Sequence, residues 1–408
     1  MDIRPILSTL GRHKFTAFLL VMEIALTCAI ICNAVFLIGQ RLERMHADSG
    51  VAEHELVFVQ MAYIGEHPDN AARSAADIAA LQSIAGVTSV TLANQFPFSG
   101  SSSNMGVRTD LAQQHDLINV SQYFGEDLTR TLGVKLVSGR NLRPEEYVDV
   151  SRVYAALRTG DLSGIPRALL ITRAVAARLW PGQDPLGKQL YVGKHISLTV
   201  VGVIAQLLRP SPGKGADFSA IMPIRTPMTQ GTAFLLRCAP QDRDRVLRAA
   251  LAKLNTLDPN RIVLGKGTFD QRRHDFFQDD RAMTGILVGV CLALLIVTAL
   301  GIVGLASFWV AQRNRSIGVR RALGATRSSI LRYFQTENFL LTSMGIVFGM
   351  VLAYGINLFL IVHYELPRLP AIYFPVGAML LWTIGQLAVL GPALRAAAVP
   401  PVVATRSV

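Results

Sequence analysis

Charged side chains are scarce in this sequence of 408 residues. They make up 17% of it, whereas about 25% is usual for a soluble protein. The deficit is local, because four long apolar runs carry almost no charge. Acids are the scarcer sign, so the net charge is +12. Such a balance suits nucleic acid or a membrane surface. No zinc-ligand cluster, helix-turn-helix outside the membrane or basic-aromatic platform is present, so we expect no nucleic-acid partner.

The residue patterns of catalytic and metal sites are also missing. The eight histidines are scattered, and neither HExxH nor G-x-S-x-G occurs. The four cysteines form no disulfide framework, because only Cys238 lies in the polar part of the chain. Cys28 and Cys32 share a helix face, which is more typical of packing among small residues than of a metal site. We therefore expect no enzyme activity, catalytic residue, metal or cofactor in this chain.

Two other segments invite a chemical interpretation that the residues do not support. Gly182–Lys188, GQDPLGK, matches the first seven positions of a phosphate-binding loop. Gln189 follows and has no hydroxyl for magnesium, Pro185 removes a backbone N–H, and the preceding segment has a helical pattern. The acidic cluster at 145–149 indicates a solvated surface rather than an acid–base pair, since no apolar pocket is implied around it.

Four apolar runs are long enough to cross a bilayer core of about 30 Å. The predicted spans are 15–39, 283–312, 338–362 and 373–394. The first is too long for a signal-peptide core and no small-x-small cleavage site follows it, so we expect an uncleaved anchor. The three segments on one side, 1–14, 313–337 and 395–408, are basic. The positive-inside rule places them, and both termini, in the cytoplasm.

The rest of the chain is then expected outside, as a short loop at 363–372 and a large part at 40–281. In that part, two similar units read strand 56–61, helix 71–84, strand 87–93 and strand 233–238, helix 242–254, strand 261–264. They predict a ferredoxin-like layer at about 50–116 and 225–270. Residues 117–224, with short strands and a helix at 173–179, predict an inserted subdomain. The fold class is thus an α-helical membrane protein with four transmembrane helices and a large α+β domain.

The basic segment Arg313–Glu337 forms a short elbow between two spans. It contains six arginines and no acid before Glu337. Apolar residues recur at helical spacing at Val319, Leu323, Ile330 and Phe334. Gly324 can close one short helix in the left-handed conformation, and Thr326 can N-cap the next. The arginines either only fix the topology or form a docking surface that receives force from a partner.

A few residues at the spans carry further expectations. Glu23 is costly in lipid, so it should face protein or headgroups, where positioning is favoured over a proton relay. Gly345 and Gly349 form a small-xxx-small face for close helix packing. Asp279 and Asp280, just before the second span, should keep that end outside and solvated.

Several motifs, in this order, resemble one family. SIGVRRALGATRSSILRYFQTENFLLTSMGIVFGMVLAYG resembles the C-terminal region of FtsX-like ABC transporter permeases. RALLITRAVAARLWPGQDPLGKQLYVG, then LTVVGVI, is similar to the periplasmic core domain of the MacB type, as is VKLVSGRNL. PALRAAAVPPVVATRSV is similar to the family's tail. The resemblance covers nearly the whole chain.

The resemblance implies a membrane subunit of a type VII ABC system in a bacterial inner membrane, working by mechanotransmission. A separate cytoplasmic ATPase, with ATP and Mg, is expected to push on the elbow, since this sequence shows no ATPase before its first span. The periplasmic domain is expected to divide into porter and sabre subdomains, and Glu337 falls at the family's acidic position. The resemblance carries ATPase coupling to Ile317, Gly318, Arg320, Arg321, Ala322, Leu323, Gly324 and Ala325.

One departure and several alternatives accompany this resemblance. Ser316 stands where the family usually has an acid, which leaves the elbow's arginines without an expected internal partner and suggests pairing with a more typical permease. The expected partners are an ATPase, a second permease subunit as homo- or heterodimer, a periplasmic adaptor, an outer-membrane channel and lipids. The leading function is export or extraction of a periplasmic substrate. The alternatives are an FtsX-like regulator of a cell-wall hydrolase and a membrane-anchored enzyme. The substrate stays open.

Overall fold

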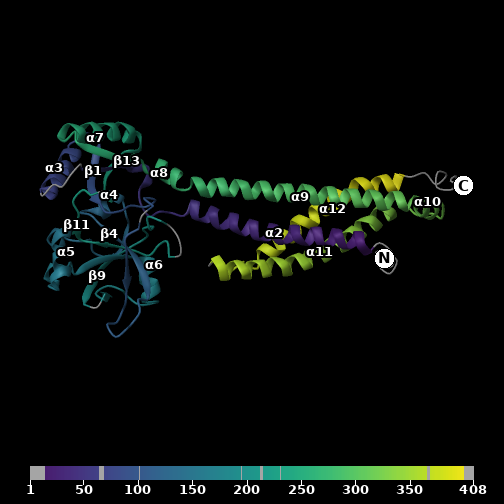
Figure 1. Ribbon diagram of the computed structural model, residues 1–408, viewed down its shortest axis with the longest axis horizontal. Coiled ribbons are helices and arrows are strands. Elements are labelled where there is room, and N and C mark those ends of the chain that lie inside the picture. Colours follow the sequence, from purple (N-terminus) through teal and green to yellow (C-terminus); the bar gives the residue numbers. More distant parts are fainter. Residues whose placement is uncertain are drawn as a thin grey trace. The chain divides into compact units, whose positions relative to one another are not determined.

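A computed structural model gives the architecture (Figure 1). The residues that it describes are 14–63, 69–100, 102–193, 195–211, 215–229, 231–364 and 368–398. The predicted basic segment 1–14, apart from Lys14, and the tail beyond Ala398 lie outside these ranges. The chain divides into a helical unit, before His46 and from Asp279 onward, and an α+β domain, His46–Gln278. Each is described by itself.

Four helices of the helical unit are long and apolar enough to cross a membrane. They are α2 (Lys14–His46), α9 (Gln278–Gln312), α11 (Arg327–Tyr364) and α12 (Tyr373–Ala398), and the short α10 (Asn314–Ala322) lies between α9 and α11. Each long helix contains one of the four predicted spans. The order of elements in this unit is therefore the one that the apolar runs predict.

The helices continue beyond the apolar runs. Helix α2 reaches His46, beyond the predicted end of the first span at residue 39. Helix α11 begins at Arg327, well before Asn338, where the third membrane span was predicted to start. The second half of the elbow is therefore the first part of the third long helix. Hydropathy reports which residues suit lipid, whereas helical hydrogen bonding continues into polar surroundings.

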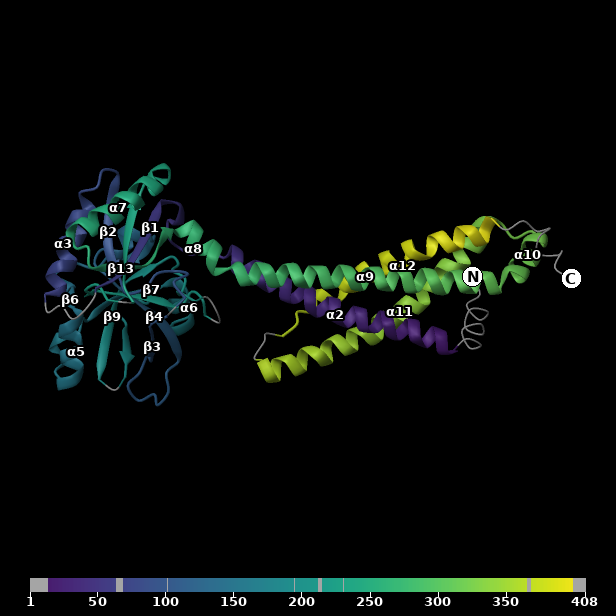
Figure 2. The ribbon, with the colours of Figure 1, turned by 45° about the horizontal axis from the view of Figure 1, so that its top comes forward.

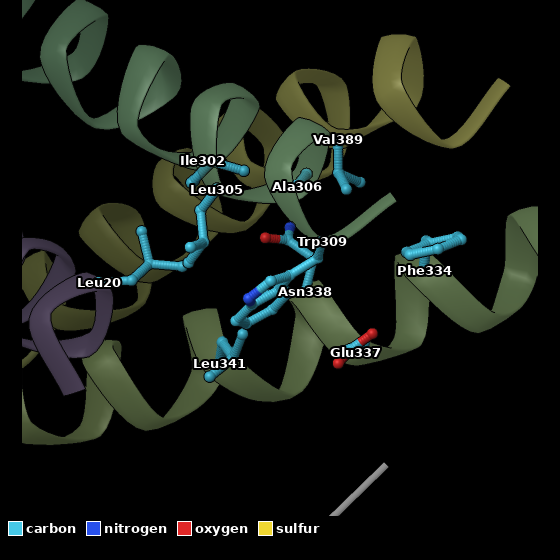
Figure 3. A pocket seen from close by; sticks show the side chains of 10 residues that line it. All are labelled: Leu20, Ile302, Leu305, Ala306, Trp309, Phe334, Glu337, Asn338, Leu341 and Val389. Carbon is cyan, nitrogen blue, oxygen red and sulfur yellow. The ribbon is translucent and has the colours of Figure 1, made fainter. Parts of the chain in front are cut away.

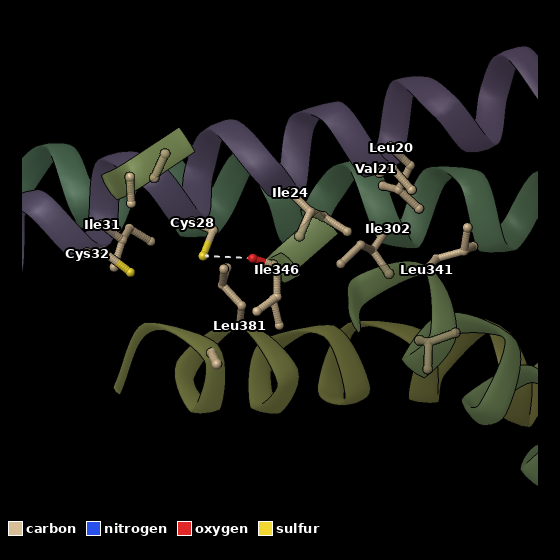
Figure 4. Close-up of a cluster of buried hydrophobic side chains, with 14 of the residues drawn as sticks. Leu20, Val21, Ile24, Cys28, Ile31, Cys32, Ile302, Leu341, Ile346 and Leu381 are labelled. Carbon is tan, nitrogen blue, oxygen red and sulfur yellow. Dashed lines mark hydrogen bonds between the residues drawn. The ribbon is translucent and has the colours of Figure 1, made fainter. Parts of the chain in front are cut away.

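The core of the helical unit joins all four long helices (Figure 4). Small residues let α11 approach α2, because a Cβ added at Gly345 would lie 2.6 Å from Ile24 Cγ2 and one at Gly349 would lie 2.5 Å from Cys28 Cβ. The Cys28 thiol donates to the Ile346 carbonyl over 3.9 Å. Polar side chains also bond between helices, as expected where lipid offers no partners. These bonds are Thr27 to Thr298 at 2.9 Å, Asn33 to the Ala353 carbonyl at 3.2 Å, and Asn338 to the Gly385 carbonyl at 2.9 Å.

The first lobe of the α+β domain is a four-stranded antiparallel sheet with two helices. Its strands, in the order β13-β1-β12-β2, are Arg261–Thr268, Leu56–Tyr63, Ala233–Cys238 and Val87–Ala93. Helices α3 (Asn70–Gln82) and α7 (Arg243–Leu257) bury Leu81, Val246 and Leu254 in a core shared with the sheet. Both predicted strand–helix–strand units are present, with helix ends shifted by a few residues. Strand β2 lies at one edge of the sheet.

The second lobe is built on a seven-stranded sheet of mixed direction (Figure 2). Its strands are β3 (Asn104–Val107), β4 (Ile118–Phe124), β5 (Leu136–Gly139), β7 (Ala168–Thr172), β8 (Gln189–Val192), β9 (Ile196–Ile204) and β10 (Ser219–Met222). Its helices are α5 (Val150–Thr159) and α6 (Arg173–Leu179), and β6 (Val148–Asp149) pairs with β11 (Ile224–Arg225). The second sheet begins with β3, before residue 117 where the sequence predicted the inserted part to start.

Further short helices complete the domain. They are α4 (Leu128–Leu132), α8 (Phe269–Phe276) and 3₁₀ turns at Glu53–Glu55, Pro144–Glu146, Leu162–Gly164 and Pro240–Asp242. Inside the first lobe, Arg261 on β13 makes two hydrogen bonds of 2.8 Å with the Asp77 carboxylate on α3. Both side chains are buried, so this ion pair fixes the helix to the edge strand.

Candidate functional site

The segment between α9 and α11 folds into one short helix and a tight turn. Helix α10 is followed by Gly324, whose φ is +99°. Glycine adopts this left-handed conformation without the steric cost of a side chain. Thr326 Oγ1 then accepts a hydrogen bond of 3.2 Å from the Ser329 N–H, which is an N-cap for α11. The glycine turn and the threonine cap are both as the sequence predicted.

One face of α10 is anchored in the helical unit. Ile317 and Gly318 are buried. The Ile317 side chain belongs to a small core of Val310, Ile330, Phe334, Ala393, Ala396 and Ala397, which come from α9, α11 and α12. Two of the eight residues predicted to couple to an ATPase therefore hold the elbow in place rather than face outward.

The opposite face of the elbow is open. Arg320, Ala322, Leu323 and Gly324 are exposed, and Arg321 and Ala325 are half-buried. The Leu323 side chain is 83% exposed. An apolar side chain next to arginines is a usual composition for a protein interface, where Arg is enriched. Six of the eight predicted coupling residues are therefore at least partly accessible.

The base of the elbow is tied to α11 by a buried ion pair. Arg313 Nη1 lies 3.1 Å from Glu337 Oε1 and 3.0 Å from Oε2, and Arg313 Nη2 lies 3.2 Å from Oε1. The Glu337 side chain is 2% exposed and that of Arg313 is 15% exposed. The Arg313 guanidinium also lies over the Trp309 ring at 5.5 Å. One arginine thus joins the ends of α9 and α10 to the body of α11.

This pair corrects one expectation from the sequence. The replacement of the family's usual acid by Ser316 predicted arginines without an internal partner, and for Arg313 that prediction was wrong. Ser316 Oγ instead donates to the Arg313 carbonyl at 2.9 Å. Arg320 also has an internal contact, since its guanidinium lies 5.4 Å from the Tyr333 ring centroid. Helical spacing could not reveal the ion pair, because its residues are 24 positions apart.

A small cavity of about 20 Å³ lies next to this ion pair. Figure 3 shows the Trp309 indole of α9 beside Glu337, Asn338 and Leu341 of α11. Leu20 of α2 reaches the same cavity. Val389 of α12 lines it as well, so all four long helices meet at the point where the elbow is anchored.

Glu23 of α2 faces protein, as expected for an acid within a span. A Cβ added at Gly301 of α9 would lie 2.7 Å from Glu23 Oε2. Among the residues that the structure describes, none hydrogen-bonds to Glu23 Oε1. The absence of a side chain at Gly301 therefore makes the space for this carboxyl group.

The far ends of α2 and α9 are joined by a second set of ion pairs. Asp280 accepts from Arg41, and its Oδ2 lies 3.3 Å from Arg44 Nη2. Asp280 is buried, whereas Asp279 is exposed. The expectation of a solvated end therefore fits Asp279 and was wrong for Asp280. Two arginines of α2 cover the Asp280 carboxylate, and they fix the two helices to each other where each meets the α+β domain.

No nucleotide or metal centre emerges from the described ranges. Gly182–Lys188 follows α6, whereas a phosphate-binding loop follows a strand. Among the residues placed by the structure, no group of three His, Cys, Asp or Glu side chains could hold a metal ion. The four cysteines are free and buried.

These features define a class. Four apolar helices, an α+β domain between the first and second and a basic elbow between the second and third describe a multi-span membrane protein with one large domain outside the bilayer. Residues 25–254 match the family model of the MacB-like periplasmic core domain, and residues 288–401 match that of the FtsX-like permease C-terminal region. The chain belongs to the MacB- and FtsX-like ABC transporter permeases.

Curated relatives are similar over part of their length. The chain is 26% identical over 258 residues to the macrolide export ATP-binding/permease protein MacB of Nitrobacter winogradskyi, covering 59% of this chain and 38% of the relative. It is 28% identical over 268 residues to the pyoverdine export ATP-binding/permease protein PvdT of Pseudomonas putida, covering 61% and 39%. It is 26% identical over 267 residues to the uncharacterized ABC transporter permease YvrN of Bacillus subtilis, covering 61% of this chain and 64% of the relative.

Two solved structures also match the chain. The periplasmic region of MacB from Actinobacillus actinomycetemcomitans gives a TM-score of 0.34 at 12% identity, covering 57% of this chain and 97% of that one. The extracellular domain of YknZ, from Gram-positive bacteria, gives a TM-score of 0.30 at 14% identity, covering 51% of this chain and 100% of that one. The family assignment comes from the two family models.

Proposed function

We propose that this chain is the membrane subunit of a type VII ABC system. A separate cytoplasmic ATPase, acting with ATP and Mg, moves the elbow, and the chain transmits that movement to its α+β domain in the periplasm. The work done there is export or extraction of a periplasmic substrate across or from a bacterial inner membrane. The porter and sabre subdomains of the family correspond in this proposal to the first and second lobes.

The buried Arg313–Glu337 ion pair is the observation that carries the proposal. The ion pair and the buried Ile317 both connect α10 to α11. In this proposal, a force on the exposed face of α10 is therefore transmitted directly to α11. Removing one partner of a buried ion pair costs about 3–5 kcal/mol, because the other charge is left uncompensated. The elbow therefore responds to a push as one body with α11.

The ends of α2 and α9 support the same proposal at the other side of the bilayer. Helix α2 ends at His46, where the α+β domain starts, and α9 starts at Gln278, where that domain ends. Asp280 bonds to both Arg41 and Arg44 between the two helices. A displacement of either helix is thus passed into the domain by the chain itself.

The orientation and the partners complete the proposal. The basic elbow lies in the cytoplasm with both termini, following the positive-inside rule. The ATP-binding part, which the printed names of the MacB and PvdT relatives include, is supplied here by a separate chain. A second permease subunit forms a homo- or heterodimer with this one, and a periplasmic adaptor and an outer-membrane channel are further partners.

The test is a pull-down of the full chain from nanodiscs, with and without a non-hydrolysable ATP analogue, followed by mass spectrometry. We expect a soluble ATPase that is retained more strongly with the analogue. In R320E/R321E the ATPase should be lost, because the charge on the contact surface is reversed. R327E/R395E, which makes the same charge change outside the eight coupling residues, should retain it.

Other outcomes would redirect the proposal. Equal ATPase retention by both double variants means that the arginines of the elbow serve only topology. A copurifying cell-wall hydrolase, without adaptor or outer-membrane channel, supports the regulator instead of the transporter. If no ATPase is retained in any condition, the proposed coupling is wrong.

A further inference from the structure

A cavity of about 480 Å³ lies between the two lobes of the α+β domain. Ligand sites in proteins are commonly about 300–1,000 Å³ and favour the junctions between substructures. Helix α3 and strand β2 of the first lobe form one side. The segment after β4, the β6–α5 junction and β11 of the second lobe form the other.

The first-lobe side of the cavity is largely apolar. Ile78 and Ala75 come from α3, and Val90 and Leu92 come from β2. Strand β2 is the last strand of its sheet, so no further strand covers its outer edge. Asn70 and Ser74, the polar residues of α3 in this wall, are already hydrogen-bonded to the Met228 backbone. This wall therefore suits the apolar body of a ligand.

The second-lobe side carries an excess of negative charge. The residues that line it include the acids Glu126, Asp127 and Asp149 and the cation Arg225, and Arg130 lies 3.8 Å from Asp127. Arg225 is already engaged, since its Nε and Nη2 lie 3.0 and 3.1 Å from the Glu126 carboxylate and its guanidinium lies over the Tyr147 ring. The carboxylate of Asp127 is partly exposed beside the exposed Arg130, and that of Asp149 is exposed, so a ligand can reach both. This local excess stands out in a chain whose net charge is +12.

The two carboxylates differ in how they are held. Asp127 has a φ of +56°, a conformation that is uncommon outside glycine and is kept only where the surroundings fix it. Its N–H donates to the Tyr147 hydroxyl at 3.2 Å, and its own carboxylate is 3.8 Å from the exposed Arg130. Asp149 precedes α5, is exposed and makes no side-chain cap to that helix. One acid is therefore fixed at the wall, and the other is free to turn toward a ligand.

We propose that this cavity binds an amphipathic organic cation. Its apolar body lies against Ile78, Val90 and Leu92, and its cationic group faces Asp127 and Asp149. Because such a ligand touches both lobes, its binding changes the free energy of any movement between them. The inference rests on the proposed function for its meaning, as the substrate site of the transporter, but its test does not require an ATPase.

The test measures binding of rhodamine 6G, a cationic apolar dye, by fluorescence anisotropy to the full chain in nanodiscs of zwitterionic lipid. Empty nanodiscs give the contribution of lipid. A75F, on an exposed helical position, and S151W, on the opposite wall, should each weaken binding at least about tenfold because they fill the cavity. D149N should weaken it about threefold to tenfold through the lost charge. D244N, an exposed acid of α7 outside the cavity, should change nothing.

A matched pair of competitors tests the sign of the charge. Tetraphenylphosphonium should displace the dye, and tetraphenylborate, of the same shape and opposite charge, should not. Equal affinities in all variants, displacement by both ions, or no binding above that of empty nanodiscs would overturn the inference. Dye binding without any retained ATPase would leave the site intact and contradict the proposed coupling instead, so the two failures are distinguishable.

Discussion

At the scale of single residues, the most informative contact joins Arg313 to Glu337. Ser316 stands where the family usually has an acid. Glu337, on helix α11, supplies a carboxylate to Arg313 instead. The geometry is bidentate, with three N–O distances between 3.0 and 3.2 Å. Guanidinium and carboxylate groups in this arrangement fix orientation as well as distance. The first residue of the elbow is therefore held by its last residue, which lies 24 positions later on helix α11.

We predict that R313M and E337L each destabilise the chain and that the double variant does not add the two losses. Each single variant leaves one buried charge without its partner, at a cost of about 3–5 kcal/mol, whereas removal of both charges avoids that cost. Thermal unfolding of the purified full chain in detergent gives the apparent Tm values. R315M, at an exposed position of α10, serves as the control and should lie near wild type.

Additive losses in the double variant would show that the two side chains act separately. A wild-type Tm for either single variant would contradict the burial that the structure gives to the pair.

At the scale of elements, the approach of α11 to α2 depends on two glycines. Gly345 and Gly349 were recognisable in the sequence as a small-xxx-small pair, because such spacing places both on one helix face. The helix that they contact was not recognisable, since Ile24 and Cys28 lie more than three hundred positions earlier. A one-dimensional pattern identifies a face of a helix but not its partner.

We predict opposite effects for the same substitution at two positions of α11. In G349A the new Cβ lies 2.5 Å from Cys28 Cβ and 2.7 Å from the Ala25 carbonyl oxygen, so the backbones must separate, at about 1–3 kcal/mol. In G355A nothing lies within 4 Å, and the gain in helix propensity is up to about 1 kcal/mol. Apparent Tm values in detergent measure both. Equal shifts in the two variants would remove the packing role from Gly349.

The elements themselves were largely predictable. Strands β2 and β12 and helix α6 have the bounds that the sequence predicted, since each is a compact apolar or periodic segment. The start of helix α11 was predicted by the N-cap at Thr326, whereas the apolar pattern predicted only its later part, from Asn338, because its first turns are basic and amphipathic. The second lobe was placed too late, because β3 is only four residues long and is recognisable only through its pairing with β4.

At the scale of the whole molecule, the orientation in the membrane follows from charge. The proposed topology places Ser316 in the cytoplasm and Ser83 of the α+β domain on the other side. Both serines are exposed, and all four native cysteines are buried. The chain is therefore suited to labelling at introduced cysteines.

We predict that a membrane-impermeant maleimide labels S83C in intact spheroplasts and S316C only after lysis. In the proposed topology the arginines near Ser316 keep that segment in the cytoplasm, so the reagent reaches it only once the membrane is open. The unsubstituted chain is the control for background labelling. The reverse order of labelling would invert the topology and remove the basis of the proposed function.

The proposed ligand cavity could not be predicted from the sequence. Its walls come from residues as far apart as Asn70 and Pro227, and only the packing of two lobes brings them together. The sequence analysis assigned the acids at 145–149 to a solvated surface. Asp149 is indeed exposed, yet it lies beside Val150 and Arg225 at the rim of an apolar cavity.

The burial of Glu337 determines how the Arg313–Glu337 ion pair responds to the ionic strength of the surroundings. Dissolved ions screen exposed charges over a Debye length of about 8 Å at physiological salt, and over about 3 Å at 1 M, but they screen buried pairs much less. Concentrated salt therefore weakens attraction to the exposed Arg320 while the Arg313–Glu337 contact persists. A partner bound through the exposed arginines would dissociate at high salt concentration. The elbow would keep its conformation after the partner has dissociated.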